Sequence, residues 1–167
     1  ELLWFIEGST LAADLHKRGV HFWDPWIKPT QEAFGYSEGE FGPIYGKQWR
    51  DFEGVDQLTE AMRLLRENPD SRRIAVTSWH PRDINRVFVA PCIRYFQYHH
   101  AQGRLGLSII QGSADVGVGV PFDIAEYALL LLMTARVHNM QPGLLNHFLV
   151  DAHIYKNHIP DMENLIK

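Results

Sequence analysis

The fold is decided by residues 93–111, IRYFQYHHAQGRLGLSIIQ. Aromatic and β-branched residues lie on both sides of Gln102-Gly103, a dipeptide typical of a tight hairpin turn. We therefore predict a strand over Ile93 to Tyr98 and a second strand over Leu105 to Gln111. A chain reversal of this kind pairs the two strands antiparallel.

The segments on either side of this hairpin alternate between helical and extended patterns. We predict helices over 1–7, from Ser9 or Thr10 to Gly19, and over 55–67, 122–137 and 157–166. Further strands are expected over 74–79, 87–89 and 145–151, with a long irregular loop over 20–49. This order indicates an α+β fold, a mostly antiparallel mixed sheet with helices packed on one side. We expect one domain over 1–167, truncated at both ends; at the N-terminal end a helical pattern without an initiator Met is already present at Glu1.

Composition excludes several classes of protein. The net charge of the 167 residues is −4, which gives no general attraction to nucleic acid or to an acidic membrane. The longest apolar runs, such as Ala128 to Met133, are too short to cross a bilayer, and no secretory leader is visible. With a single cysteine there is no internal disulfide framework. We expect a cytoplasmic protein that binds neither DNA nor membrane.

The single cysteine, Cys92, follows Ala90-Pro91 where a strand begins. It is either a small buried hydrophobe or a reactive thiol, and composition leaves both alternatives open. A reactive thiol needs a positive neighbour to become a thiolate at neutral pH. Arg94 is two residues further on, and residues i and i+2 of a strand share one face.

Other polar groups fall at the ends of predicted elements. Arg72 and Arg73 are either a phosphate-binding fork or a solvated charge pair. Residues 111–115, Gln-Gly-Ser-Ala-Asp, end a strand with small residues that admit a ligand, although a bulge or turn would have the same composition. Asp123 begins a predicted helix, where an acidic residue also serves as a cap.

Histidines provide one further candidate pair and no metal centre. His153 and Tyr155 alternate across Ile154, so on a strand both would face one ligand; the alternative is two ordinary half-buried residues. The spacings among His99, His100, His153 and His158 fit no standard metal site, so we predict no metal.

Taken together, eight segments resemble the thymidylate synthases and the related pyrimidine-nucleotide hydroxymethylases, in the family's order and over nearly the whole chain. The segments are 1–5 ELLWF, 23–26 WDPW, 42–50 GPIYGKQWR, 70–73 DSRR, 90–92 APC, 111–115 QGSAD, 119–125 GVPFDIA and 152–158 AHIYKNH. The resemblance implies that Cys92 adds to C6 of the pyrimidine, after which C5 attacks 5,10-methylenetetrahydrofolate. A synthase then transfers hydride to the one-carbon unit, whereas a hydroxymethylase adds water.

The resemblance also implies roles for particular side chains. The nucleotide would be held by Arg72, Arg73, Gln111, Ser113, His153 and Tyr155. Within that set, Arg72 and Arg73 would reach the phosphate bound by the other subunit of a homodimer. Glu1 would organise proton transfer, while Trp23 and Tyr45 would contact the folate and Asp115 would contact both the folate and the base.

Four departures from the family pattern are informative. At the position that the resemblance assigns to base recognition, the synthases carry Asn and this chain carries Asp123. A carboxylate accepts from the N4 amino group of cytosine and from a protonated N3, whereas it opposes O4 of uracil. Ile93 stands where the synthases carry His, and Ala114 where they usually carry Cys. Gly112 replaces a phosphate-binding Arg, for which Arg94 is a candidate substitute.

We therefore predict a CMP or dCMP 5-hydroxymethylase that uses methylenetetrahydrofolate without a metal. Gly112 and Ala114 favour a ribonucleotide, as in the CMP enzymes of nucleoside-antibiotic pathways. One alternative is a thymidylate synthase or a dUMP hydroxymethylase. A catalytically silent nucleotide-binding scaffold is the alternative of another class.

Overall fold

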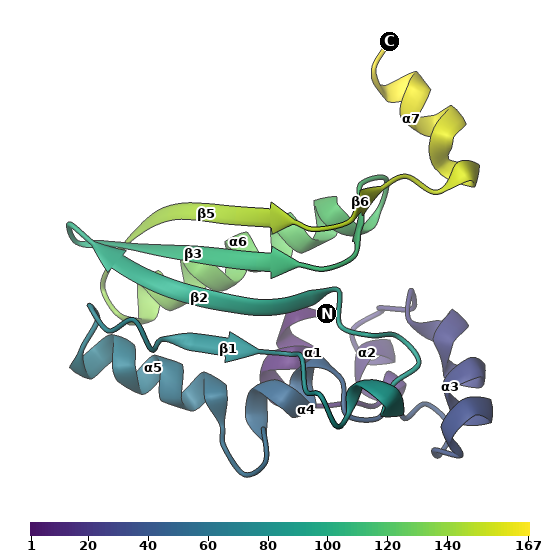
Figure 1. Ribbon diagram of the computed structural model, residues 1–167, viewed down its shortest axis with the longest axis horizontal. Coiled ribbons are helices and arrows are strands. Elements are labelled where there is room, and N and C mark those ends of the chain that lie inside the picture. The colour runs from purple at the N-terminus through teal and green to yellow at the C-terminus, as the bar shows by residue number, and fades with distance from the viewer. The chain divides into compact units, whose positions relative to one another are not determined.

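The computed structural model describes residues 1–167, which divide into two compact units, Glu1–Pro91 and Cys92–Lys167. The first unit contains α1 (Leu2–Glu7), α2 (Ala12–His16), the 3-10 helix η1 (Asp24–Trp26), α3 (Ile27–Phe34), α4 (Tyr45–Arg50), α5 (Gln57–Glu67), β1 (Ala75–Thr77) and the 3-10 helix η2 (Ile84–Arg86). The second unit contains β2 (Ile93–Ala101), β3 (Arg104–Gln111), β4 (Ala114–Asp115), α6 (Gly119–Val137), β5 (Gln141–Leu149), β6 (Ala152–His153), the 3-10 helix η3 (Lys156–His158) and α7 (Ile159–Leu165) (Figure 1). The predicted α+β class is confirmed, while the single domain over 1–167 stays a prediction.

The second unit is built on the predicted hairpin. β2 and β3 pair antiparallel, and both residues of the two-residue turn, Gln102 and Gly103, have positive φ. β5 pairs parallel to β3, so the chain must cross over between them, and α6 provides that crossover. Sheet order β2-β3-β5 thus makes a mixed sheet with α6 along one face (Figure 1).

The core of this unit lies between the sheet and α6. Alternate residues of β2 and β3, including Phe96 and Ile109, are buried on the face toward the helix. Tyr127 of α6 meets the ring of Phe96 edge to face at 5.7 Å, a favourable aromatic geometry. The hydroxyls of Tyr98 and Thr134 lie 2.9 Å apart and satisfy each other inside this core.

Helix ends in the first unit follow local sequence signals. α1 ends at Gly8, whose φ of 77° is the left-handed conformation that glycine adopts without strain. α5 begins after Asp56, whose carboxylate accepts from the backbone N–H of Thr59. An aromatic cluster of Trp4, Trp23 and Phe41 is buried in this unit, with ring centroids 5.1–5.9 Å apart.

Three local predictions are wrong. Residues 20–49 are not an irregular loop, because they contain η1, α3 and α4; their Gly, Pro and aromatic content concealed short helices such as Ile27–Phe34, which Gly35 terminates at φ 68°. Residues 87–89 form no strand. The cap of α2 is Leu11, because the Ser9 hydroxyl instead accepts from the Leu11 N–H and donates to Asp14. None of the helices is both long and apolar enough to cross a membrane.

Candidate active site

Cys92 is the first residue of the second unit and lies directly before β2. Its carbonyl oxygen accepts a 2.7 Å hydrogen bond from the backbone N–H of Gly112, because β2 begins where its antiparallel neighbour β3 ends. The residue is neither fully buried nor fully exposed. A structural cysteine is usually sealed in the core, so this position favours the reactive alternative.

Arg94 lies over Gly112, at the same end of the sheet. A Cβ atom added to Gly112 would lie 2.1 Å from Nε and 2.4 Å from Cζ of Arg94. The guanidinium group therefore occupies the space that a side chain at position 112 would fill. The expected pairing of Cys92 and Arg94 on one strand face does not follow, because Cys92 precedes β2 and the register shifts between Ile93 and Tyr95.

Gln111, the last residue of β3, is only 1% exposed and carries a hydrogen-bond network. Its Nε2 donates to the carbonyl oxygen of Ser113 at 2.8 Å and to Oδ2 of Asp123 at 2.7 Å. Its Oε1 lies 2.6 Å from Nε2 of His147 on β5. Burial lowers the pKa of His147 below its usual value of 6.5, which favours the neutral imidazole.

Asp123 is half-buried and lies in the second turn of α6, not at its start as predicted. The helix begins at Gly119 with Val118 as its cap residue, so Asp123 is not an N-cap. The alternative role as a helix cap is therefore wrong. The hydrogen bond from Gln111 instead holds the Asp123 carboxylate at the end of β3.

The short parallel pair of β4 and β6 adjoins this end of the sheet. Asp115 pairs in register with His153, and its Oδ1 accepts from the N–H of Gly117. β6 ends at His153, so Tyr155 is not on a strand, yet the two rings meet edge to face at 5.1 Å. Nδ1 of His158 is buried, makes no hydrogen bond, and lies 3.9 Å from Oδ1 of Asp115. Ser113 is exposed.

In the first unit the structure brings two predicted site residues together. Nε1 of Trp23 donates to Oε1 of Glu1 at 2.8 Å, so the indole orients the carboxylate. Trp23 itself is 7% exposed. Tyr45 is 6% exposed and stacks on Phe5 at 4.5 Å, the position of a core residue. Its expected contact with folate stays a prediction.

Arg72 and Arg73 lie in the exposed turn that joins α5 to β1. The Ser71 hydroxyl accepts from the N–H of Arg73 and shapes this turn. Both residues lie in a turn rather than on a strand, and loops often carry binding residues. Their phosphate-binding role stays a prediction.

His147 is the residue of this region that sequence reasoning missed. The sequence does contain a signal for His147, because it lies between Leu145 and Leu149 at alternate, inward-facing positions of β5. A polar side chain among leucines requires a hydrogen-bond partner. That partner is Gln111, the polar residue that ends β3. The predicted strand over 145–151 already contains all three positions, although β5 itself starts earlier, at Gln141, so the sequence carried this signal.

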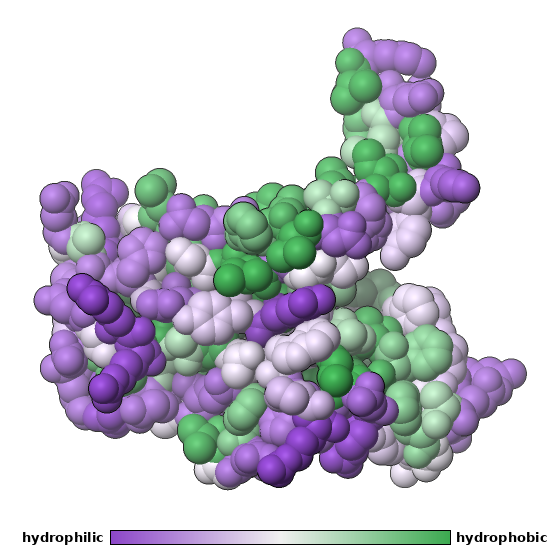
Figure 2. Space-filling model, in the orientation of Figure 1, coloured by the Kyte–Doolittle hydropathy of each residue, from purple (hydrophilic) through white to green (hydrophobic).

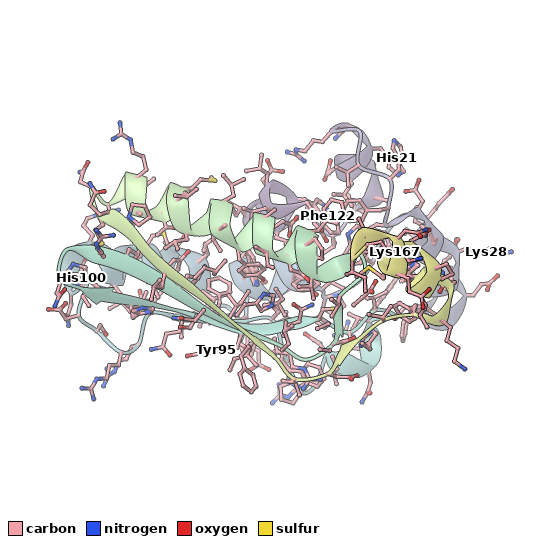
Figure 3. The ribbon with its side chains drawn as sticks, turned by 90° about the horizontal axis from the view of Figure 1, so that it is seen from above. His21, Lys28, Tyr95, His100, Phe122 and Lys167 are labelled. Carbon is pink, nitrogen blue, oxygen red and sulfur yellow. The ribbon has the colours of Figure 1, made fainter.

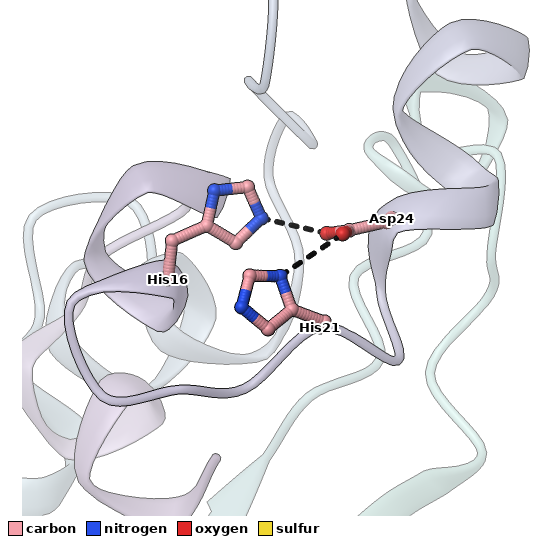
Figure 4. Close-up of side chains that lie close together, drawn as sticks. All are labelled: His16, His21 and Asp24. Atoms are coloured by element: carbon pink, nitrogen blue, oxygen red, sulfur yellow. Dashed lines mark hydrogen bonds and ion pairs between the residues drawn. The ribbon is translucent and has the colours of Figure 1, made fainter.

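One group of potential metal ligands was also missed, in the first unit. His16, His21 and Asp24 converge, with the two rings stacked at 4.7 Å (Figure 4). The donor atoms of tetrahedral zinc are about 3.3 Å apart given its usual bond lengths. Nε2 of His16 lies only 2.6 Å from Asp24, which is a hydrogen bond, and this bond lowers the pKa of the Asp24 carboxyl. The cluster is an exposed hydrogen-bonded group as it stands, and the absence of a metal stays a prediction.

One end of the sheet in this α+β unit gathers a cysteine, a buried amide bonded to a half-buried carboxylate, and an arginine, a set of polar and titratable groups typical of a binding or catalytic site. The description "Thymidylate synthase" belongs to a family model that matches residues 1–167 in full. The chain therefore belongs to the thymidylate synthase family.

A curated relative supports the same assignment. The thymidylate synthase of Mycoplasma genitalium is 40% identical over 185 aligned residues, which cover 98% of this chain. The chain spans 64% of that relative's length. The suspected membership of the family is confirmed, whereas the closer kinship to CMP hydroxymethylases stays a prediction.

Proposed function

We propose that this protein is a pyrimidine-nucleotide C5 one-carbon transferase that hydroxymethylates cytidylate, CMP or dCMP. The observation that carries the proposal is the contact between Gln111 and Asp123, 2.7 Å long. This N–H occupies one oxygen of the carboxylate, and the other oxygen can likewise only accept, so residue 123 presents no donor to the base. Cytosine offers the matching N4 amino donor, whereas uracil offers the acceptor O4 at that position.

The proposed chemistry distributes three tasks among the residues. The Cys92 thiolate adds to C6 of the base and leaves again when the product forms. Asp123 accepts from N4 and from a protonated N3, and that proton makes C6 a better target for the thiolate. Glu1, held by Trp23, relays the proton that leaves C5. Methylenetetrahydrofolate is the co-substrate that supplies the carbon, and water completes the hydroxymethyl group.

Arg94 takes the place of a phosphate-binding side chain at position 112 in this proposal. Its guanidinium fills the space above Gly112, and Ser113, the next residue, is exposed. A planar fork of N–H donors matches phosphate oxygens in bidentate geometry. Arg72 and Arg73 of the second subunit complete the phosphate site.

We expect Arg94→Ala to raise the KM for the nucleotide monophosphate by roughly 10- to 100-fold, since a hydrogen bond to a charged group contributes about 1.5–3 kcal/mol. Gly112→Ala should have a similar effect, because its Cβ would displace the guanidinium. Steady-state kinetics and titration with the uncharged nucleoside check this, because nucleoside affinity should not change. Arg104→Ala, at the other end of β3, is the matched control. Unchanged nucleotide affinity in Arg94→Ala would exclude the role.

A homodimer through the outer sheet face completes the proposal. We define this face as Tyr95, Ile110, Leu144, Phe148 and Val150. Leu144 and Phe148 are 72% and 64% exposed, and Figure 3 shows Tyr95 on the opposite side of the sheet from α6. Figure 2 shows hydrophobic surface gathered over β5. The bonded polar pair of Asn146 and Ser108 interrupts this face. Exposed apolar side chains gathered on one face are typical of an isologous interface.

We expect native mass spectrometry of the full-length protein to give a dimer, and Phe148→Asp to give a monomer. The charge would have to be buried without a partner at the interface, which costs several kcal/mol. If the unmodified protein is a monomer at micromolar concentration, the roles of Arg72 and Arg73 across the interface are excluded as well.

The proposed function is tested by offering CMP, dCMP, UMP and dUMP separately, with methylenetetrahydrofolate, to the full-length protein. Mass spectrometry of the nucleotide should show a gain of CH2O on a cytosine nucleotide, and the same experiment identifies the sugar. A gain of CH2 on dUMP would instead establish the alternative, a thymidylate synthase, which is the name borne by the Mycoplasma genitalium relative. No product from any nucleotide would favour the silent scaffold.

A further inference from the structure

The orientation of the Gln111 amide is determined by its surroundings. The carbonyl oxygen of Ser113 lies 2.8 Å from one end of the amide and can only accept, so that end must be Nε2. The same nitrogen gives its second hydrogen to Oδ2 of Asp123. Both N–H groups are thereby used, and Oε1 must face His147.

His147 must in turn be a donor. Oε1 of Gln111 only accepts, and it lies 2.6 Å from Nε2 of His147. The imidazole therefore carries its proton on Nε2. Register supports the contact, because His147 is paired with Ile109 and both lie on the sheet face that also carries Gln111. Gln111 is 1% exposed, so no bulk water replaces this donor.

The direction of the network constrains Asp123. Gln111 delivers an N–H to Oδ2, so residue 123 must present an acceptor on that side. The opposite atom of the side chain then differs between Asp and Asn: it is an oxygen in one and an N–H donor in the other. Because Gln111 fixes one side of the side chain, Asp at position 123 presents an acceptor to the base, whereas Asn would present a donor.

We propose that His147 is a positioning residue for base recognition, which donates to Gln111 and thereby holds the Asp123 carboxylate in the orientation that meets the base. The inference rests on the proposed function, because it assumes that residue 123 contacts the base. His147 itself touches no reacting atom. Removing its N–H leaves the buried Oε1 without a donor, so the amide rotates or draws in water and its grip on Asp123 loosens.

The test compares His147→Gln, which keeps an N–H donor, with His147→Leu, which fills a similar volume without one. The readout is the ratio of kcat/KM for the cytosine nucleotide to that for the uracil nucleotide, with kcat and KM reported separately. We expect the leucine variant to lose at least about tenfold in this ratio and the glutamine variant to stay within about threefold, since tenfold corresponds to the loss of one buried hydrogen bond. His147→Phe, which keeps a ring, is the second variant without a donor if the leucine variant fails to fold.

A role confined to packing would lower stability in both variants and leave the ratio unchanged, and that outcome overturns the inference. Equal loss of the ratio in the glutamine and leucine variants overturns it too. If a variant turns over too slowly, the ratio of Kd values from calorimetry gives the same decision. A wild-type protein that prefers uracil refutes the proposed function alone. The role of His147 is then still decided by whether His147→Leu reduces that preference while His147→Gln does not. Equal use of both bases by the wild type would refute both.

Discussion

Replacing Cys92 by serine should lower kcat by about 10³-fold or more while nucleotide affinity changes less than about threefold. The reason is the nucleophile: a serine hydroxyl is almost never ionised at neutral pH, whereas a thiol near its ordinary pKa already supplies some thiolate. Cys92 is half-buried, and its hydrogen bond with Gly112 uses the backbone carbonyl, so the substitution leaves the sheet end intact. Single-turnover kinetics and calorimetric titration check the two halves of this prediction.

The chain itself provides the control for this experiment. Cys92 is its one cysteine, so a thiol reagent that reacts with this chain reports on that position alone. We expect alkylation to stop turnover and bound nucleotide to slow the alkylation. Retention of more than roughly a tenth of the turnover in Cys92→Ser would contradict covalent catalysis. Nucleotide binding without any turnover in the unmodified protein would favour the scaffold alternative.

The regular part of the fold could be predicted because its signals are local. The turn Gln102-Gly103 marks the β2–β3 hairpin, and the apolar period over residues 55–67 marks α5. The short helices between residues 20 and 49 were missed, because each is too short for several apolar repeats and they lie in a segment rich in Pro, Gly and aromatic residues. The bulge between Ile93 and Tyr95 also escaped prediction, since it depends on pairing with β3.

Within the candidate site, family motifs indicated which residues matter but not how they are connected. The sequence suggested that Arg94 substitutes for a side chain missing at Gly112, and the structure adds that the Arg94 guanidinium occupies the space next to Gly112. The contact of His147 with Gln111 joins residues 36 apart in sequence, and no spacing rule reports such a pair. Hydrogen-bond direction requires coordinates, because it follows from which neighbour can only accept.

Asp123→Asn should shift base preference toward uracil and change the cytosine-to-uracil ratio of kcat/KM by about 100-fold. Each unmatched buried polar group costs about 1–3 kcal/mol, and a tenfold change corresponds to about 1.4 kcal/mol. Gln111 would still find an acceptor, because the amide oxygen of the substituted side chain can take the place of Oδ2 and keep the side chain in its orientation. The remaining amide N–H then faces the base and donates to O4 of uracil, where it opposes the N4 amino group of cytosine. Kinetics with both nucleotides measure the ratio directly.

The matched control is Asp115→Asn, the same chemical change at the neighbouring half-buried carboxylate. Asp115 accepts from the N–H of Gly117 and lies near His158, and we expect its contacts with the base and the folate to be common to both nucleotides. Its substitution should therefore lower the rate with both bases together and leave their ratio within about threefold. A shift confined to the Asp123 variant assigns base choice to that carboxylate. Equal ratios in the two variants and the wild type would mean that another group reads the base, and the argument for a cytosine substrate would fail with it.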